Sequence, residues 1–182
     1  MVVDPRRTET AGIADQHLFI RPGIDVLLLL ALLQVVLDEG LERPDRIGGF
    51  AEGLETVRRL VADLPPERVA GVTGIAADEI RSLARQFAAA PSAVCYGRLG
   101  VSTQRFGGLC QWLVNLLNIV TGNLDRPGGA LAIVLSNVIT RVAGPAAFVK
   151  ADVDYTNRRD GQDSLAHLNV LHVFVNDNGA WR

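Results

Sequence analysis

Three short loops hold residues whose chemistry would suit a bound nucleotide. They span residues 4–9, 22–25 and 97–104, and they contain acids, arginines and glycines. A carboxylate can accept hydrogen bonds from ribose hydroxyls or a guanine edge, and an arginine can pair with phosphate. Glycines before a helix let backbone N–H groups approach a pyrophosphate. The residue types therefore favour a nucleotide at these loops.

The same residues also have a purely structural interpretation. Asp4 and Pro5 can form a turn, and Asp25 can cap a helix. Gly97 and Gly100 can be glycines that only allow close packing. The G-x-G-x-x-G fingerprint of dinucleotide-binding folds is absent. On the residues alone, both interpretations stay open.

The elements predicted around these loops are those of an α/β protein. Residues 2–3 have the character of the end of a buried strand, and 18–20 and 92–96 have the composition of short strands. The order strand, helix, strand, glycine-containing loop and helix predicts an open Rossmann-like sheet with flanking helices. Ligands bind such sheets at the carboxyl ends of the strands. Because nothing precedes the first strand to complete it, we expect an incomplete sheet and a truncated chain.

Four helices are predicted from apolar side chains at helical spacing. Asp25 is placed to act as N-cap of the first helix, and Gly40 fits its C-terminal stop. Trp112 falls on the apolar stripe of the last helix and is therefore predicted to lie in the core. The predicted helices cover residues 26–37, 54–64, 77–89 and the region around 109–120.

The pattern weakens toward the C-terminus. Residues 133–139 and 170–175 have strand composition, whereas 152–163 is polar and is predicted to be a loop. We therefore predict a partial α/β domain over 1–130 and a divergent or irregular, poorly defined tail over 131–182.

Composition and charge exclude several classes of partner. The 182 residues include 18 basic and 20 acidic side chains, a net charge of -2, so no overall field would recruit nucleic acid. The longest apolar run, 26–37, would measure about 18 Å as a helix, short of the roughly 30 Å that a bilayer requires. Cys95 and Cys110 lie in no zinc-ligand pattern and are interpreted as buried small hydrophobes. We predict no membrane segment and no metal ligand in this chain.

A family resemblance extends over residues 2–130. The motifs that carry it are Val2-Val3-Asp4-Pro5-Arg6-Arg7-Thr8-Glu9-Thr10-Ala11, Ala14-Asp15, Ile20-Arg21-Pro22-Gly23-Ile24-Asp25, Pro66-Glu67-Arg68-Val69, Val72-Thr73-Gly74, Glu79-Ile80-Arg81, Leu99-Gly100-Val101 with Gln104, and Thr121-Gly122-Asn123-Leu124-Asp125-Arg126-Pro127-Gly128-Gly129. In this order and spacing, they resemble the cofactor-binding domain of the bis-molybdopterin-guanine-dinucleotide oxidoreductases, the family of formate dehydrogenases and nitrate reductases.

The resemblance implies roles for the three loops. In the family, the loop matching 4–8 lines the guanosine and phosphate end of one pterin cofactor, and the loop matching 23–25 contacts the same nucleotide. The loop matching 99–104 approaches the pterin nearer the metal. The implied cofactor-binding residues are Asp4, Pro5, Arg6, Arg7, Thr8, Gly23, Ile24, Asp25, Leu99, Gly100 and Gln104.

Two of these positions depart from the family pattern. One residue more than in some relatives lies between Gly100 and Gln104, which leaves Thr103 as an alternative to Gln104 for the pterin contact. Ile24 replaces the small hydroxyl residue that is frequent there, at the expense of one hydrogen bond to the ligand.

The resemblance also implies a cofactor and partners for the whole protein. The cofactor is molybdopterin guanine dinucleotide with molybdenum or tungsten. In the family, the protein ligand to the metal and any iron–sulfur cysteines lie upstream of the strand that opens this chain, so we expect no catalytic residue here. The expected partners are the remaining domains of a full-length oxidoreductase and a small-molecule substrate.

We accordingly expect a cytoplasmic molybdopterin-dependent oxidoreductase as the full-length protein, and no activity from this chain alone. Two other hypotheses stay open. The chain would be a stand-alone, non-catalytic nucleotide-binding or interaction domain if another of its segments completed the opening strand and closed the sheet. It would be a non-functional truncated product if apolar faces made for absent domains were exposed and caused self-association.

Overall fold

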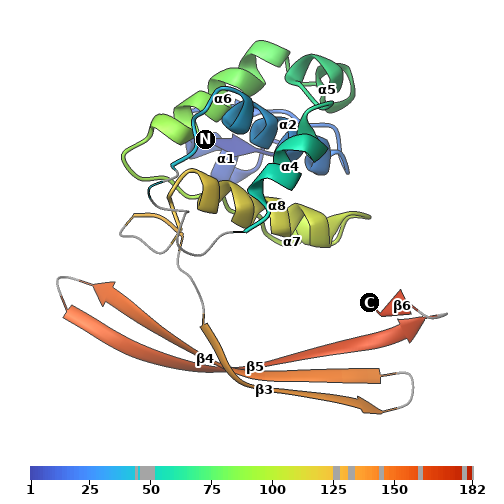
Figure 1. The fold of residues 1–182 in the computed structure, drawn as a ribbon, viewed down its shortest axis with the longest axis vertical. Helices are drawn as coiled ribbons and strands as arrows, with labels where there is room; N and C mark the ends of the chain where they lie inside the picture. The colour runs from blue at the N-terminus through green and yellow to red at the C-terminus, as the bar shows by residue number, and fades with distance from the viewer. Residues whose placement is uncertain are drawn as a thin grey trace. The chain divides into compact units, whose positions relative to one another are not determined.

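The structure is a computed structural model of the chain (Figure 1). Two compact units are distinguished, Met1–Leu131 and Ala132–Arg182, and each is described by itself. Both backbone and side chains are described for residues 1–43, 45, 52–124 and 128–130, and the backbone alone for 134–143, 146–159, 162–177 and 180–181.

The first unit is mostly helical. The periodicity of the sequence predicted α2, α4, α6 and α8, and α6 has the predicted bounds. Three further helices were not predicted. One of them, α5, begins at Pro66, because a proline at the first helical position lacks only an N–H that would have no partner there. The elements are β1 (Val2–Val3), α1 (Glu9–Ile13), β2 (His17–Leu18), α2 (Asp25–Asp38), α4 (Leu54–Val61), α5 (Pro66–Thr73), α6 (Ala77–Ala89), α7 (Leu99–Ser102) and α8 (Gly107–Val120).

Helix α2 is the centre of this unit. Helices α4, α5, α6 and α8 all pack against it, which explains why nearly every side chain from 26 to 37 is apolar. Leu33 and Val36 are fully buried. Gly40 follows the helix with φ +63°, and the Leu41 amide donates to the Val36 carbonyl at 2.9 Å. Gly40 therefore ends the helix as predicted, since the left-handed conformation favours glycine.

The sheet of the first unit is smaller than predicted. Strands β1 and β2 are parallel, with Val2 opposite His17 and Val3 opposite Leu18. Among the described residues of this unit they form a two-stranded sheet, and segment 93–97, which overlaps the strand predicted over 92–96, pairs with neither of them. The fold is thus a mixed helical one with a small parallel sheet, and an open Rossmann-like sheet is not formed by the described residues.

Asparagine side chains explain why segment 93–97 is not a paired strand. Asn118 of α8 accepts a hydrogen bond from the Cys95 amide and donates one to the Cys95 carbonyl, both at 2.8 Å. Asn123 accepts another from the Ala93 amide at 3.2 Å. The backbone groups along one edge of the segment are therefore bonded to side chains, where a neighbouring strand would otherwise bind them.

Helix α8 has a buried apolar face and an exposed one. Cys110, Leu113 and Leu117 are almost completely buried. In contrast, Trp112 is 50% exposed, and the neighbouring Leu109 is exposed as well. The prediction of Trp112 as a core residue is therefore wrong, because the apolar stripe of this helix is wider than the surface that its described neighbours cover.

The second unit is an antiparallel sheet of order β3-β4-β5-β6. The expected irregular tail is thus replaced by regular strands, and the loop predicted over 152–163 is wrong for residues 152–159, which belong to β4. Polar and apolar residues alternate there, as in Asp152-Val153-Asp154-Tyr155, a pattern typical of strands. Residues 133 and 160–161 of the predictions lie outside the described residues. The strands are β3 (Val134–Ala143), β4 (Ala146–Arg159), β5 (Gln162–Asp177) and β6 (Ala180–Trp181).

Candidate functional site

The first loop begins directly at the carboxyl end of β1. The Asp4 amide donates to the Leu18 carbonyl of β2 at 3.1 Å, which fixes the residue at the end of the sheet. One carboxylate oxygen of Asp4, Oδ1, accepts a hydrogen bond from the Arg6 amide at 2.7 Å. Within the described part of the chain, the second oxygen has no hydrogen bond. Asp4 therefore shapes the loop and still offers one acceptor to a ligand.

The rest of the first loop is open to solvent. Pro5, Arg6 and Arg7 are exposed, and in the described part of the chain neither guanidinium group makes an ion pair. Thr8 is the N-cap of α1, and its hydroxyl accepts from the Ala11 amide at 3.2 Å. The loop thus holds two cationic side chains that have no ion-pair partner among the described residues, beside the end of a parallel strand, where α/β proteins bind ligands.

The second loop leads into the N-terminus of α2. Gly23 has φ +81°, a conformation that a glycine adopts without strain, and Ile24 is the N-cap residue without a side-chain hydrogen bond. The prediction of Asp25 as N-cap is wrong, because Asp25 is the first residue of the helix. The N-terminal end of a 14-residue helix is thus left without a side-chain cap, and its N–H groups and dipole favour an anion.

The third loop is partly helical and reaches the second one. Residues 99–102 form α7, and Leu99 is 76% exposed. Gln104 donates from Nε2 to Oδ2 of Asp25 at 2.6 Å and to the Gly100 carbonyl at 2.8 Å. Thr103 instead donates its hydroxyl to the Leu99 carbonyl at 2.9 Å. Of the two alternatives left open by the sequence, Gln104 is the one that faces the second loop.

The structure therefore joins two of the three loops directly. Asp25 and Gln104 are 79 residues apart in sequence and share a hydrogen bond. In the described part of the chain, no hydrogen bond or ion pair connects residues 4–8 with either side chain. Oδ1 of Asp25 has no hydrogen-bond partner among the described residues, so this carboxylate also keeps one acceptor available.

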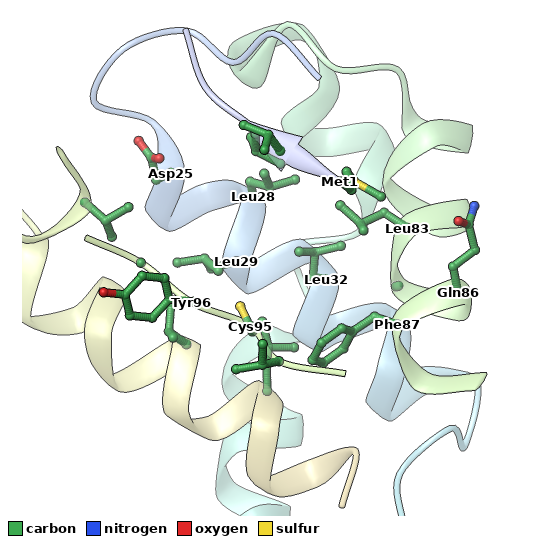
Figure 2. Close-up of a pocket in the computed structure, with 18 of the residues that line it drawn as sticks. Met1, Asp25, Leu28, Leu29, Leu32, Leu83, Gln86, Phe87, Cys95 and Tyr96 are labelled. Carbon is green, nitrogen blue, oxygen red and sulfur yellow. The ribbon is translucent and has the colours of Figure 1, made fainter. Parts of the chain in front are cut away.

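An apolar cavity of about 560 Å³ lies beside these loops (Figure 2). Leu28, Leu29 and Leu32 of α2 line it from one side, and Asp25 stands at its edge. Asp25 is also the one cofactor-binding residue predicted from the sequence that lines it. The cavity has none of the arginines that a phosphate would pair with, so its chemistry does not suit the charged end of a nucleotide.

The two cysteines are poorly suited to nucleophilic chemistry. Burial raises the pKa of the Cys95 thiol to about 11. Burial raises the pKa of Cys110 as well, and the nearby Asp25 carboxylate adds to the effect. At neutral pH both are therefore protonated thiols. Among the described residues, no cluster of three or more His, Cys, Asp or Glu could hold a metal ion, and no described helix has the length and hydropathy to cross a membrane.

Sequence reasoning missed two residues that shape this region. Asn118 and Asn123 are each 1% exposed, and their side chains hold segment 93–97 in place. The sequence did contain a signal, because Asn118 is a polar residue on the apolar stripe of α8. A buried amide on such a stripe requires partners, but the sequence does not say where they are.

Comparisons with known proteins place this arrangement in a wider class. No protein-family model matches the chain. Formate dehydrogenase H of Escherichia coli is 37% identical over 127 residues, which are 70% of this chain and 18% of that protein. A nitrate reductase of Symbiobacterium thermophilum is 35% identical over 142 residues, 71% of this chain and 18% of that protein. The solved structure of acetylene hydratase from Pelobacter acetylenicus has a TM-score of 0.68 at 28% identity, covering 75% of this chain and 19% of that one.

Helices around a small parallel sheet define a mixed α/β segment. The similar proteins identify it further, since they are molybdopterin oxidoreductases. The chain thus belongs to the molybdopterin oxidoreductase family, of which it carries a part: it spans about 18% of the length of the curated relatives that it matches. The names of those relatives include a dehydrogenase, reductases and a hydratase, so the shared segment does not by itself determine the reaction.

Proposed function

We propose that this chain acts within a molybdenum or tungsten oxidoreductase and holds the guanine dinucleotide of its molybdopterin cofactor. The binding residues are those of the three loops, 4–8, 23–25 and 99–104. The observation that carries the proposal is the hydrogen bond between Gln104 and Asp25. It supports a single site, because two loops nominated independently from sequence meet at the N-terminus of α2.

The available groups fit the nucleotide end of such a cofactor. Arg6 and Arg7 are exposed cations that can pair with phosphate, and the N-terminus of α2 offers N–H groups to the same charge. Asp4 and Asp25 each keep a carboxylate oxygen that can accept from ribose or guanine. When bound, the cofactor would supply the redox chemistry through its metal. The residues of this chain would bind and orient the cofactor.

The pterin end would lie nearer the third loop. Gln104 is already fixed by Asp25 and by the Gly100 carbonyl, so its amide is held in a defined orientation before any ligand arrives. This preorganisation reduces the entropy that ordering the side chain would cost on binding. We propose that Gln104 is a positioning residue that orients Asp25, and that its amide oxygen faces the pterin.

The remaining parts of the proposal concern the whole protein. Its partners would be further domains of the oxidoreductase and a small-molecule substrate, and the cytoplasm is its proposed location. A closed sheet would favour the competing hypothesis of a stand-alone domain. The two strands described for the first unit do not form a closed sheet, and the exposed Trp112 and Leu99 are consistent with contacts to further domains.

Guanine nucleotide binding to the 182-residue chain tests the proposal. We expect GDP to shift the amide NMR signals of Arg6, Gly23 and Asp25 with a Kd on the order of 1 mM, or about 4 kcal/mol, since many contacts of the whole site are missing. The double variant Arg6→Ala/Arg7→Ala should weaken binding roughly tenfold, the effect of about 1.4 kcal/mol.

A matched control uses an arginine outside the site. Arg59 of α4 is exposed, like Arg6 and Arg7, and Arg59→Ala should leave GDP binding unchanged. Equal weakening by Arg59→Ala would show that GDP binds by non-specific charge. A folded chain whose loop amides do not move at any GDP concentration would contradict the proposal.

A further inference from the structure

Phe19 is a large aromatic residue on the solvent side of the small sheet. It directly follows β2 and is 56% exposed. Its two chain neighbours, Leu18 and Ile20, are buried in the apolar cluster that includes residues of α2. Because successive side chains of an extended chain point to opposite faces, Phe19 points away from that cluster. The alternation that buries its neighbours therefore keeps the phenyl ring in solvent.

His17 supports the ring of Phe19 on one side. The two ring centroids are 4.2 Å apart, with the ring planes inclined by 52°. The imidazole is itself held in place, since its Nε2 donates to the Asp4 carbonyl at 3.0 Å. Arg21, the next residue in the same alternation, donates to the Gly71 carbonyl of α5 at 2.8 Å. The phenyl ring thus has a fixed neighbour on one side, while more than half of the residue remains accessible.

The first loop lies beside Phe19. Val3 is opposite Leu18, and the Asp4 amide continues this pairing by donating to the Leu18 carbonyl at 3.1 Å. The position beside Asp4 is therefore Phe19, and neighbouring positions of paired strands share a face. One carboxylate oxygen of Asp4 has no hydrogen bond among the described residues, and two exposed arginines follow in the same loop. An aromatic ring, an acceptor and two cations thus lie close together at the end of the sheet.

We propose that Phe19 is the surface on which the base of the bound guanine nucleotide stacks, an inference that rests on the function proposed above. Bases stack on aromatic side chains because every base has a π face. The charged surroundings favour this ligand over a protein surface, since the centres of protein interfaces are depleted of charged residues. Phe19 contributes affinity for the base, whereas Asp4 and the arginines contribute affinity for polar edges, sugar and phosphate.

GDP titrations of the full 182-residue chain and of two variants test the stacking. Phe19→Leu keeps an apolar side chain but removes the aromatic face, and we expect it to weaken GDP binding about fivefold. Phe19→Trp keeps an aromatic face and should bind GDP about as well as the unaltered chain. Inorganic pyrophosphate, which has no base, should bind Phe19→Leu and the unaltered chain equally. The H8 signal of GDP should also move upfield on binding, as expected for a base stacked on a ring.

Phe106→Leu is the matched control. Phe106 precedes α8 and is 49% exposed, similar to Phe19, and its replacement should leave GDP binding unchanged. Equal weakening by both leucine variants, or weaker pyrophosphate binding by Phe19→Leu, would overturn the stacking inference. Unchanged GDP binding by Phe19→Leu would also overturn it, while leaving the proposed function intact. Failure of the proposed function is distinguishable, because GDP would then shift no loop amides even in the unaltered chain.

Discussion

The two sides of β1 differ in chemistry, and the difference indicates what each of them binds. The carboxyl end of the strand leads into polar loops with exposed arginines and carboxylate oxygens that remain available. Residues 1–3, which include the strand itself, help to line a cavity formed mainly by leucine, valine and other apolar side chains. Charged groups recognise a ligand that carries charge, whereas an apolar cavity favours apolar groups. One short strand thus separates a proposed ligand site from an apolar cavity.

The largest expected effect distinguishes the closed core from the cavity wall. Leu33 is fully buried, whereas Leu29 lines the cavity. We expect Leu33→Ala to lower the free energy of unfolding by about 3–5 kcal/mol and Leu29→Ala by about 2 kcal/mol. The Leu29 side chain has fewer contacts to lose on the cavity side. Urea denaturation measures both, and equal losses would contradict an open cavity.

A second prediction concerns the edge of segment 93–97 that is bonded to asparagine side chains. Asn118→Ala removes the partners of the Cys95 N–H and C=O groups. We expect it to lower the free energy of unfolding by about 2–3 kcal/mol, the cost of leaving buried polar groups unsatisfied, and to accelerate hydrogen exchange of the Cys95 amide. Asn115→Ala, at an exposed position of the same helix, is the control. Comparable losses from both variants would show that the segment does not depend on Asn118.

The sequence predicted the helices better than the sheet, and the reason is physical. Helix α6 follows from periodic apolar residues over its own length, so a local pattern is sufficient. Segment 93–97 has the residues of a strand, but pairing depends on a neighbour elsewhere in the chain, and the side chains of Asn118 and Asn123 bind its backbone instead. A single sequence shows which residues favour a strand, and not which edge will pair.

The same limit applies to the candidate site. The sequence nominated Asp25 and Gln104 separately, and a resemblance supplied their expected role. It did not show that the two side chains share a hydrogen bond, nor that Asp25 lies inside the helix instead of capping it. The hydrogen bond depends on where the loop after α7 lies relative to the N-terminus of α2, which local patterns do not encode.

A third prediction tests the backbone of the second loop. Gly23→Ala places a side chain at φ +81°, and an added Cβ would meet no other atom within 4 Å. Only the backbone strain should therefore matter, with a loss of about 1–2 kcal/mol. Gly12→Ala in α1, which also meets nothing within 4 Å, should be neutral or slightly stabilising because alanine favours helices. Thermal unfolding compares the two variants. An unchanged stability of Gly23→Ala would contradict the left-handed conformation of residue 23.

The smallest expected effect lies far from both regions. Arg85 donates two hydrogen bonds to Glu39, at 2.7 and 2.9 Å, and this contact lowers the pKa of Glu39. The contribution to stability is therefore present above the ordinary pKa of a glutamate and is lost as the pH falls through the lowered value. Because Arg85 is exposed, we expect only a small loss from Arg85→Ala at pH 7 and a smaller one near pH 3. Urea midpoints at both pH values measure this loss of stability. A loss that is larger at acidic pH would contradict a stabilising contact between Arg85 and ionised Glu39.

One NMR experiment tests the separation of the two regions most directly. Amide signals of the full chain are recorded during a titration with GDP. The account predicts that GDP shifts Arg6, Gly23 and Asp25 and leaves the signals of residues 94–96, which line the cavity, nearly unchanged. If GDP shifts only the amides around the cavity, or no amides of the loops, the account of a charged ligand site beside an apolar cavity is wrong.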